Sequence, residues 1–154
     1  LYEEHKKPNR AEDIYLEALP LVEKTMGPNH VGTALILRQI GGVQYSQKRY
    51  QEAAATFGLA AQAFIRSPDN KRKPFRVSGM LRRKGHSHIF LRQYDEAEAA
   101  YLESLAVSEA AIGPRHSRIA ACLEDLAGLY RDQFQMDKAK EYQDRAKKIR
   151  AMNR

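Results

Sequence analysis

Few residues in this 154-residue chain have the types and the spacing that chemistry needs. His86 and His88 are the one pair that resembles metal ligands. On a helix, two residues at this separation point about 200° apart, so we do not expect them to share an ion. Cys122 is the single cysteine. It lies beside the apolar stripe of its segment, which favours a small buried side chain over a reactive thiol.

The sequence motifs of the common enzyme classes are missing. There is no Walker-type glycine-rich loop, no nucleophile elbow and no zincin motif. His30 and His116 instead end two copies of one junction, Gly27-Pro28-Asn29-His30 and Gly113-Pro114-Arg115-His116. A catalytic residue rarely needs copies, so we expect each histidine to help start the following helix or to pack against its neighbour. The sequence therefore predicts a protein that is not an enzyme and that uses no cofactor and no metal.

The net charge of +7 comes from one short segment. The chain has 26 Lys and Arg against 19 Asp and Glu, and the segment 71–84 holds seven basic residues and no acidic one. The rest of the chain is therefore neutral. This indicates a local positive surface rather than a globally basic nucleic-acid binder. The basic patch consists of Lys71, Arg72, Lys73, Arg76, Arg82, Arg83 and Lys84.

A small–large–small pattern recurs along the chain. It places an alanine first, an aromatic residue four positions on, and a small residue three positions later. The leading alanines are 42, 44 and 42 residues apart. A spacing of i, i+4 and i+7 forms one stripe on a helix, so each copy predicts a helix that a neighbour can approach closely. The copies are Ala11-Tyr15-Ala18, Ala53-Phe57-Ala60, Ala97-Tyr101-Ser104 and, at two of three places, Ala139-Gln143-Ala146.

Helices are the expected secondary structure throughout. The long segments are rich in Ala, Leu, Glu, Arg and Lys, and sustained period-2 runs are missing. The longest uncharged run has thirteen residues, Ala53 to Ile65, whereas a bilayer span needs about 20. We predict one unpaired helix followed by three antiparallel pairs, with no membrane span. The expected helices cover residues 8–25, 31–46, 50–66, 75–91, 94–111, 117–133 and 136–151.

These residues resemble the tetratricopeptide repeat, a helix–turn–helix unit. The period near 42 and the Gly-Pro-x-His junction are similar to the kinesin-light-chain and nephrocystin-3 type of that repeat. The best matches are the segment Tyr94 to Tyr101 and the run Gly113-Pro114-Arg115-His116, Ile119, Ala120, Leu123, Leu126, Ala127, Tyr130, Ala139 and Ala146. The resemblance implies an all-α, right-handed superhelix in a single domain. Its units are approximately 1–29, 30–70, 71–115 and 116–154, as a fragment of a longer array.

Several positions depart from the family pattern. Lys84 stands where the family has an apolar residue, and His88 where it has an aromatic one. Phe134 replaces the usual glycine of the last turn within a repeat, and Gln143 replaces an aromatic residue. Residues 1–7 look like the tail of a missing first helix. The pair formed by residues 75–91 and 94–111, which carries most of the basic patch, is therefore expected to be the least typical.

The resemblance also implies a concave groove lined by the first helix of each pair. Arg38, Arg82 and Arg83 would make one end positive, and Glu124 and Asp125 would make the other end negative. Tyr45 and Ile89 are candidates to receive an apolar anchor. We predict a non-catalytic scaffold that captures an extended acidic–apolar segment of a protein partner. The expected groove residues are Leu35, Arg38, Gln39, Gly42, Tyr45, Arg82, Arg83, His86, Ile89, Ala121, Glu124, Asp125, Gly128 and Arg131.

Two alternatives stay open at this point. The basic patch, with Phe75 as a stacking residue, predicts nucleic-acid contact. The open repeat ends predict instead a structural subunit of a larger assembly. In particular, a homodimer is expected through the N-terminal end, where the apolar residues are Ile14, Leu16, Leu19 and Leu21. The low cysteine count fits a reducing compartment such as the cytoplasm.

Overall fold

The computed structural model describes residues 10–68 and 73–154, and over these residues it contains helices and connecting turns. The helices are α1 (Arg10–Met26), α2 (Val31–Ser46), α3 (Tyr50–Arg66), α4 (Lys73–Phe90), α5 (Tyr94–Ile112), α6 (Ser117–Asp132) and α7 (Met136–Met152). All the predicted helices are confirmed, with ends within two residues of the expected ones. Among the described residues, no helix combines the length and the apolar character that crossing a bilayer requires.

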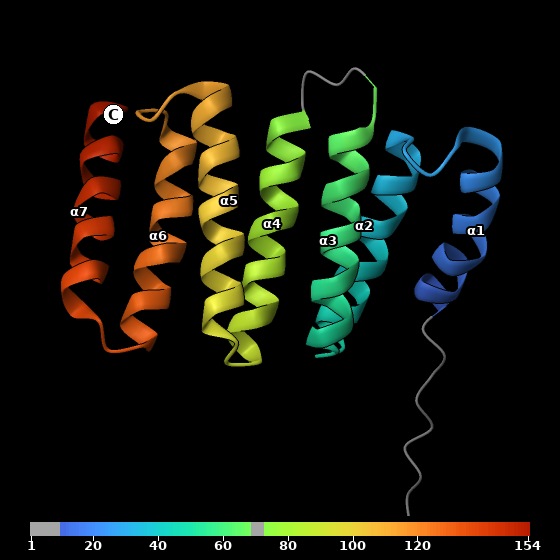
Figure 1. Ribbon diagram of the computed structural model, residues 1–154, viewed down its shortest axis with the longest axis horizontal. Coiled ribbons are helices and arrows are strands. Elements are labelled where there is room, and N and C mark those ends of the chain that lie inside the picture. Colours follow the sequence, from blue (N-terminus) through green and yellow to red (C-terminus); the bar gives the residue numbers. More distant parts are fainter. Residues whose placement is uncertain (1–9, 69–72) are drawn as a thin grey trace, which may run out of the picture.

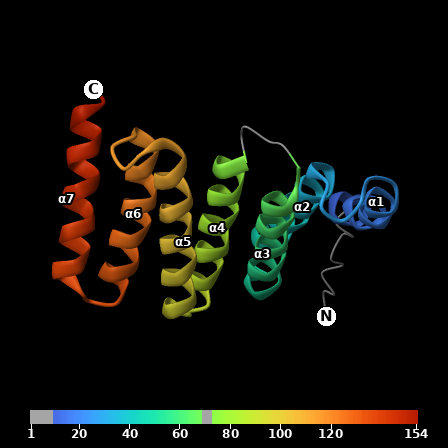
Figure 2. The same cartoon turned by 45° about the horizontal axis from the view of Figure 1, so that its top comes forward.

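The helices stand side by side in chain order from α1 to α7 (Figure 1). The pairs α2–α3, α4–α5 and α6–α7 pack internally, and α3–α4 and α5–α6 join one pair to the next. Such nearest-neighbour packing is characteristic of a solenoid. Figure 2 shows α7 along its length while α1 is seen nearly end-on, so the helix axes rotate along the array. The fold is therefore the expected all-α superhelix.

The repeated stripe packs the helices of each pair together. Phe57 and Tyr101 are buried, and each lies against a glycine of the preceding helix. A Cβ atom added to Gly41 would lie only 2.8 Å from Cε1 of Phe57, and one added to Gly85 would be closer still to Tyr101. Glycine is therefore required at both crossings, because any side chain would collide with a buried ring.

The turns inside the pairs share one backbone geometry. Lys48, Arg92 and Phe134 adopt positive φ angles of 62°, 57° and 57°. In each turn, the next N–H reaches back to a carbonyl oxygen five residues earlier, as from Gln135 to Tyr130 at 2.8 Å. This is the left-handed helix ending that glycine favours. The departure at Phe134 therefore puts a large side chain where the backbone prefers none.

The repeated junctions begin α2 and α6. Nδ1 of His30 accepts a hydrogen bond from the N–H of Gly32 at 3.0 Å, and Nδ1 of His116 accepts one from Arg118 at 3.2 Å. Each histidine is the residue that precedes its helix and satisfies an N–H with no partner inside the helix. The prediction that both histidines help start a helix is confirmed.

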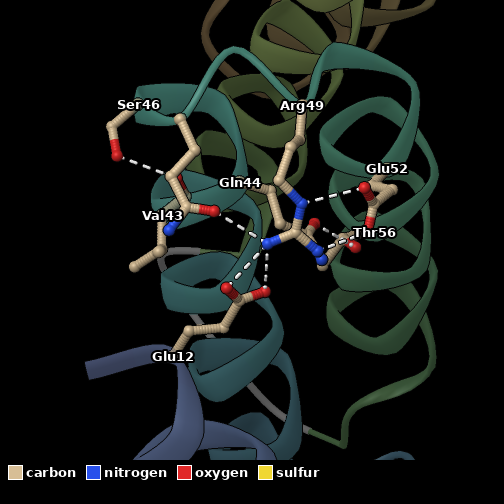
Figure 3. A network of polar contacts seen from close by, with 8 residues as sticks. Glu12, Val43, Gln44, Ser46, Arg49, Glu52 and Thr56 are labelled. Carbon is tan, nitrogen blue, oxygen red and sulfur yellow. Dashed lines mark hydrogen bonds and ion pairs between the residues drawn. The ribbon is translucent and has the colours of Figure 1, made fainter. Parts of the chain in front are cut away.

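An ion-pair cluster attaches α1 to the first pair (Figure 3). Nη1 of Arg49, in the turn between α2 and α3, donates to both carboxylate oxygens of Glu12, at 2.9 and 2.7 Å. Arg49 also binds Glu52, and this hydrogen bond holds the pKa of the Glu52 carboxyl below its ordinary value. Glu12 is only 7% exposed. The cluster therefore fixes α1 at one point near its N-terminus.

The apolar residues of α1 differ in how far their side chains are buried. Ile14, Leu16 and Leu21 are exposed, with Ile14 at 61%, whereas Leu19 is half-buried. These residues are the ones on which the dimer prediction rests. On α1, Ile14 and Leu21 lie on one face and Leu16 on the opposite one. Dimer formation through this end stays a prediction.

Candidate functional site

Helices α2, α4 and α6 line three adjoining hollows that form one groove. The largest hollow, here called the arginine cavity, measures about 760 Å³. A second of about 400 Å³, here called the tyrosine hollow, lies beside it. A third of about 300 Å³ extends toward α6. Gly79 lines all three, and a Cβ added there would have no atom within 4 Å, so the floor of the groove is open.

Four arginines surround the arginine cavity: Arg38 from α2, Arg76 and Arg83 from α4, and Arg118 from α6. None of them forms an ion pair with a carboxylate of the described residues. No aspartate or glutamate is among the described residues that line the three hollows. The groove therefore concentrates positive charge that the described chain leaves uncompensated. The other lining residues of the arginine cavity are Gln39, Gly42, Phe64, Phe75, Gly79 and Met80.

Aromatic rings hold three of these arginines. The guanidinium carbon of Arg76 lies 5.5 Å from the ring centre of Phe64. The corresponding distance is 5.7 Å from Arg83 to Phe57. From Arg118 to Phe75 it is 4.4 Å. A guanidinium group attracted to a ring face keeps the N–H groups at its edge available for an anion.

Arg82 does not belong to the uncompensated group. Its Nε donates to Oδ2 of Asp125 at 2.5 Å, and Nε2 of His86 lies 3.1 Å from Oδ1 of the same carboxylate. Burial raises the pKa of Asp125, but the hydrogen bonds from His86 and Arg82 outweigh burial, so this pKa lies below its ordinary value. The prediction of Arg82 and Asp125 at opposite ends of the groove is wrong, because their side chains meet between α4 and α6.

The expected negative end of the groove is also neutralised at Glu124. Arg150 of α7 donates from Nε and Nη2 to the two carboxylate oxygens of Glu124, at 2.7 and 2.8 Å. The hydrogen bond from Arg150 lowers the pKa of Glu124 from its ordinary value. The groove therefore carries a positive region without the matching negative one, because both acidic residues are occupied by arginines of this chain.

Tyr45, Arg83 and His86 line the tyrosine hollow together with the ring of Phe57. Tyr45 also meets Tyr50 and Phe90 edge to face, with ring centres 5.3 and 5.8 Å apart. Burial, reinforced by Tyr50, raises the pKa of Tyr45. This hollow supplies the aromatic surface next to the arginines that an apolar anchor requires.

Several expected groove residues lie elsewhere. Ile89 and Arg131 line a separate hollow of about 600 Å³ beside the turns, together with Phe90 and Phe134. Leu35 packs against the core cluster around Phe57. Ile89 and Arg131 are therefore displaced from the three hollows by the direction in which their helices present them.

The basic patch is divided among different surroundings. Lys71 and Arg72 lie outside the described residues. Lys73 donates from Nζ to the carbonyl oxygen of Ser67 at 3.0 Å. Lys84 lines another hollow, between α3 and α5, while Arg76 and Arg83 line the arginine cavity. The described members of the patch therefore do not share one face of α4.

Arg76 and Arg118 line the arginine cavity, although neither was among the groove residues predicted from the sequence. The two residues are 42 positions apart, which equals a repeat period, so they occupy the same position of successive units. An alignment of the repeats would therefore have shown that the two arginines occupy equivalent positions. Arg118 was missed because it lies outside the segment that holds the excess charge.

The remaining candidates for chemistry are held in structural roles. Cys122 is buried, with Sγ 3.7 Å from Oγ of Ser104, as predicted for a small buried residue. His88 is buried, and its Nδ1 lies 2.7 Å from Oε1 of Gln93. His86 faces Asp125 instead, so the two histidines are engaged separately. Within residues 10–68 and 73–154, no three His, Cys, Asp or Glu side chains are grouped to hold a metal ion.

A solved structure shares this architecture. BtubC (BKLC) from P. vanneervenii superposes with a TM-score of 0.78 at 21% sequence identity. The alignment covers 92% of this chain but 56% of BtubC, so the chain spans little more than half of that protein. MamA aligns over 99% of this chain and 98% of its own, with 16% identity and a TM-score of 0.42. No curated protein sequence matches the chain.

The sequence model of the tetratricopeptide repeat matches residues 1–65 and 76–151. These two ranges include most of the chain and nearly all of its described helices. Repeats of this family generally act as non-catalytic scaffolds for protein–protein interaction. The resemblance inferred from the repeated residues is confirmed, and the protein belongs to the tetratricopeptide repeat family.

Proposed function

We propose that this protein is a scaffold that binds an extended acidic–apolar segment of a protein partner in the groove formed by α2, α4 and α6. The observation that carries the proposal is the arginine cavity. Four arginines line it, no described carboxylate does, and the tyrosine hollow adjoins it. Acidic side chains of a partner would meet the arginines, while an apolar side chain would pack on Tyr45.

The arrangement supports an extended segment rather than a single small anion. The adjoining hollows share Gly79, and Arg83 belongs to both the arginine cavity and the tyrosine hollow. A ligand that occupies both must therefore present acidic and apolar groups a short distance apart. Such a combination distinguishes a peptide from an isolated metabolite, because charge and apolar burial come from different side chains.

The test uses two pools of labelled 12-residue peptides. Both pools have random flanking residues and one central Leu or Tyr. The first has two acidic residues beside the centre, and the second has two lysines instead. We expect immobilised protein to retain the acidic pool and not the lysine pool. Equal retention of the two pools would contradict an electrostatic groove.

Reversing the charge of groove arginines tests whether the acidic peptides bind in the groove. Arg38→Glu combined with Arg83→Glu should weaken binding of the acidic pool at least tenfold, since a hydrogen bond to a charged group contributes about 1.5–3 kcal/mol. Arg66→Glu combined with Arg115→Glu changes the net charge equally at exposed positions outside the groove. This control should bind like the parent protein. Equal losses in both variants would mean that net charge alone governs binding.

A further inference from the structure

The arginine cavity holds more hydrogen-bond donors than a carboxylate can use. Each guanidinium group carries five N–H donors, and four such groups line the cavity. A carboxylate has two oxygens, which a single guanidinium group can bind through two of its N–H groups. A phosphate group has three free oxygens and carries a charge of about −1.5 to −2 at pH 7. The four guanidinium groups at this cavity therefore match a phosphate better than a single carboxylate.

The positions of these arginines are built into the fold. Arg76 lies over Phe64, Arg118 over Phe75 and Arg83 over Phe57, as described above. Arginines that are already oriented by ring faces lose less freedom on binding a ligand. The four cations also repel one another across the cavity, and a ligand with two negative charges relieves this repulsion more than a ligand with one.

The floor of the arginine cavity leaves room for a phosphate group. Gly42 of α2 and Gly79 of α4 both line it, and a Cβ added at either position would have no atom within 4 Å. An oxygen-rich group can therefore come close to the helices while the arginines approach from α2, α4 and α6.

We propose that the arginine cavity binds the phosphate group of a phosphorylated side chain in the partner segment. The proposal rests on the function proposed above and specifies the chemistry of its ligand. Phosphorylation of the partner would then strengthen docking, because the unmodified side chain offers neither the charge nor the oxygens that a phosphate presents to the four arginines.

A phosphopeptide fits the cavity better than a nucleic acid. Proteins that bind single strands stack successive bases on open aromatic faces. Here Phe57, Phe64 and Phe75 already have an arginine over the ring. In addition, Arg82 is paired with Asp125 and Lys84 lines a different hollow, so the described basic residues of α4 do not form a continuous track for a phosphate backbone.

The experiment compares three labelled peptide pools that differ at one central residue, which is phosphoserine, aspartate or serine. The flanks are the same acidic–apolar mixture in each pool. We expect the phosphoserine pool to bind at least tenfold more tightly than the aspartate pool, and the serine pool to bind most weakly. Equal affinity for phosphoserine and aspartate would overturn the phosphate proposal and leave the acidic-peptide function standing. Failure of both pools to bind would overturn both.

Replacing arginine by lysine tests whether binding depends on the planar guanidinium group or only on its positive charge. Arg83→Lys combined with Arg118→Lys keeps every positive charge but removes two guanidinium groups. We expect this variant to lose the preference for phosphoserine over aspartate. Arg66→Lys, at an exposed position outside the cavity, should keep it. An unchanged preference in the double variant, with an unchanged thermal unfolding curve, would place the binding elsewhere and overturn the proposal.

A random-sequence 12-nucleotide RNA serves as the competing ligand. We expect it to displace the phosphoserine pool weakly. If the RNA binds more tightly than that pool and loses affinity in the Arg83→Lys and Arg118→Lys variant, the cavity is a nucleic-acid site and the proposal is overturned. Titration of free phosphoserine, followed by NMR of the arginine Nε–H signals, should shift the signals of the cavity arginines more than that of Arg66.

Discussion

The carboxylate of Asp125 on α6 receives the Nε–H of Arg82 on α4 at 2.5 Å and also faces His86. This ion pair crosses between two repeats rather than within one. It uses an acidic and a basic residue that the groove would otherwise present to a ligand. As a result, the groove arginines that form no ion pair with a described carboxylate are the four around the arginine cavity, and the groove is positive without a negative end.

Removing the charge of Asp125 should destabilise the contact between α4 and α6. We expect Asp125→Asn to lower the free energy of unfolding at pH 7 by about 1–2 kcal/mol, since Arg82 and His86 lose a charged acceptor. Asp144→Asn, at an exposed position, is the matched control and should change it little. Urea unfolding of both variants measures the difference.

The same contact predicts a pH dependence. The pKa of Asp125 is lower in the folded protein than its ordinary value, despite the opposing effect of burial. Its charge therefore stabilises the fold above the ordinary pKa of about 3.9, and this contribution is lost as the pH falls through the folded value. The stability difference between the parent protein and Asp125→Asn should shrink between pH 5 and pH 2. A constant difference over that range would show that the charge is not responsible.

Two glycines of α4 should respond to alanine in opposite directions. Gly85→Ala places a methyl group against the buried ring of Tyr101, and overpacking of this kind costs about 1–3 kcal/mol. Gly79→Ala has open space and gains up to about 1 kcal/mol from helix propensity. Thermal unfolding of the two variants tests this, and similar shifts in Tm would contradict the close crossing of α4 and α5.

Phe134 should be replaceable by glycine with a gain in stability. Its φ of +57° is unfavourable for a residue with a side chain, and the side chain itself is 86% exposed. Phe134→Gly should therefore stabilise the protein by about 1 kcal/mol. Phe134→Ala keeps the unfavourable backbone and should bring no such gain. If alanine stabilises as much as glycine, exposure of the ring rather than the backbone is the cause.

The attachment of α1 should depend on Glu12. In a solenoid each helix is stabilised mainly by its neighbours, so loss of one contact acts locally. We expect Glu12→Gln to speed amide hydrogen exchange in α1 while α4 to α7 stay protected. Glu17→Gln, an exposed position of the same helix, should leave the exchange in α1 unchanged. Faster exchange along the whole array would instead indicate global destabilisation.

The sequence by itself determined the helices, their pairing and their ends. The Ala–aromatic–small stripe and the Gly-Pro-x-His junction are local patterns, and each acts within one helix or between neighbours in the chain. The close approach of a neighbouring helix to the stripe that contains Tyr101, and the helix starts at His30 and His116, followed from them. The family likewise followed from residues repeated at a fixed period.

Only the tertiary structure decided which charges meet. Arg82 and Asp125 are 43 positions apart, and their pairing depends on how far α6 is rotated and shifted relative to α4. The same geometry brings Arg118 beside Arg76 and Arg83 in one cavity. A repeat period specifies equivalent positions in each unit, but small rotations between units determine which long side chains face one another. The charge of the groove therefore emerges from the stacking of the helices.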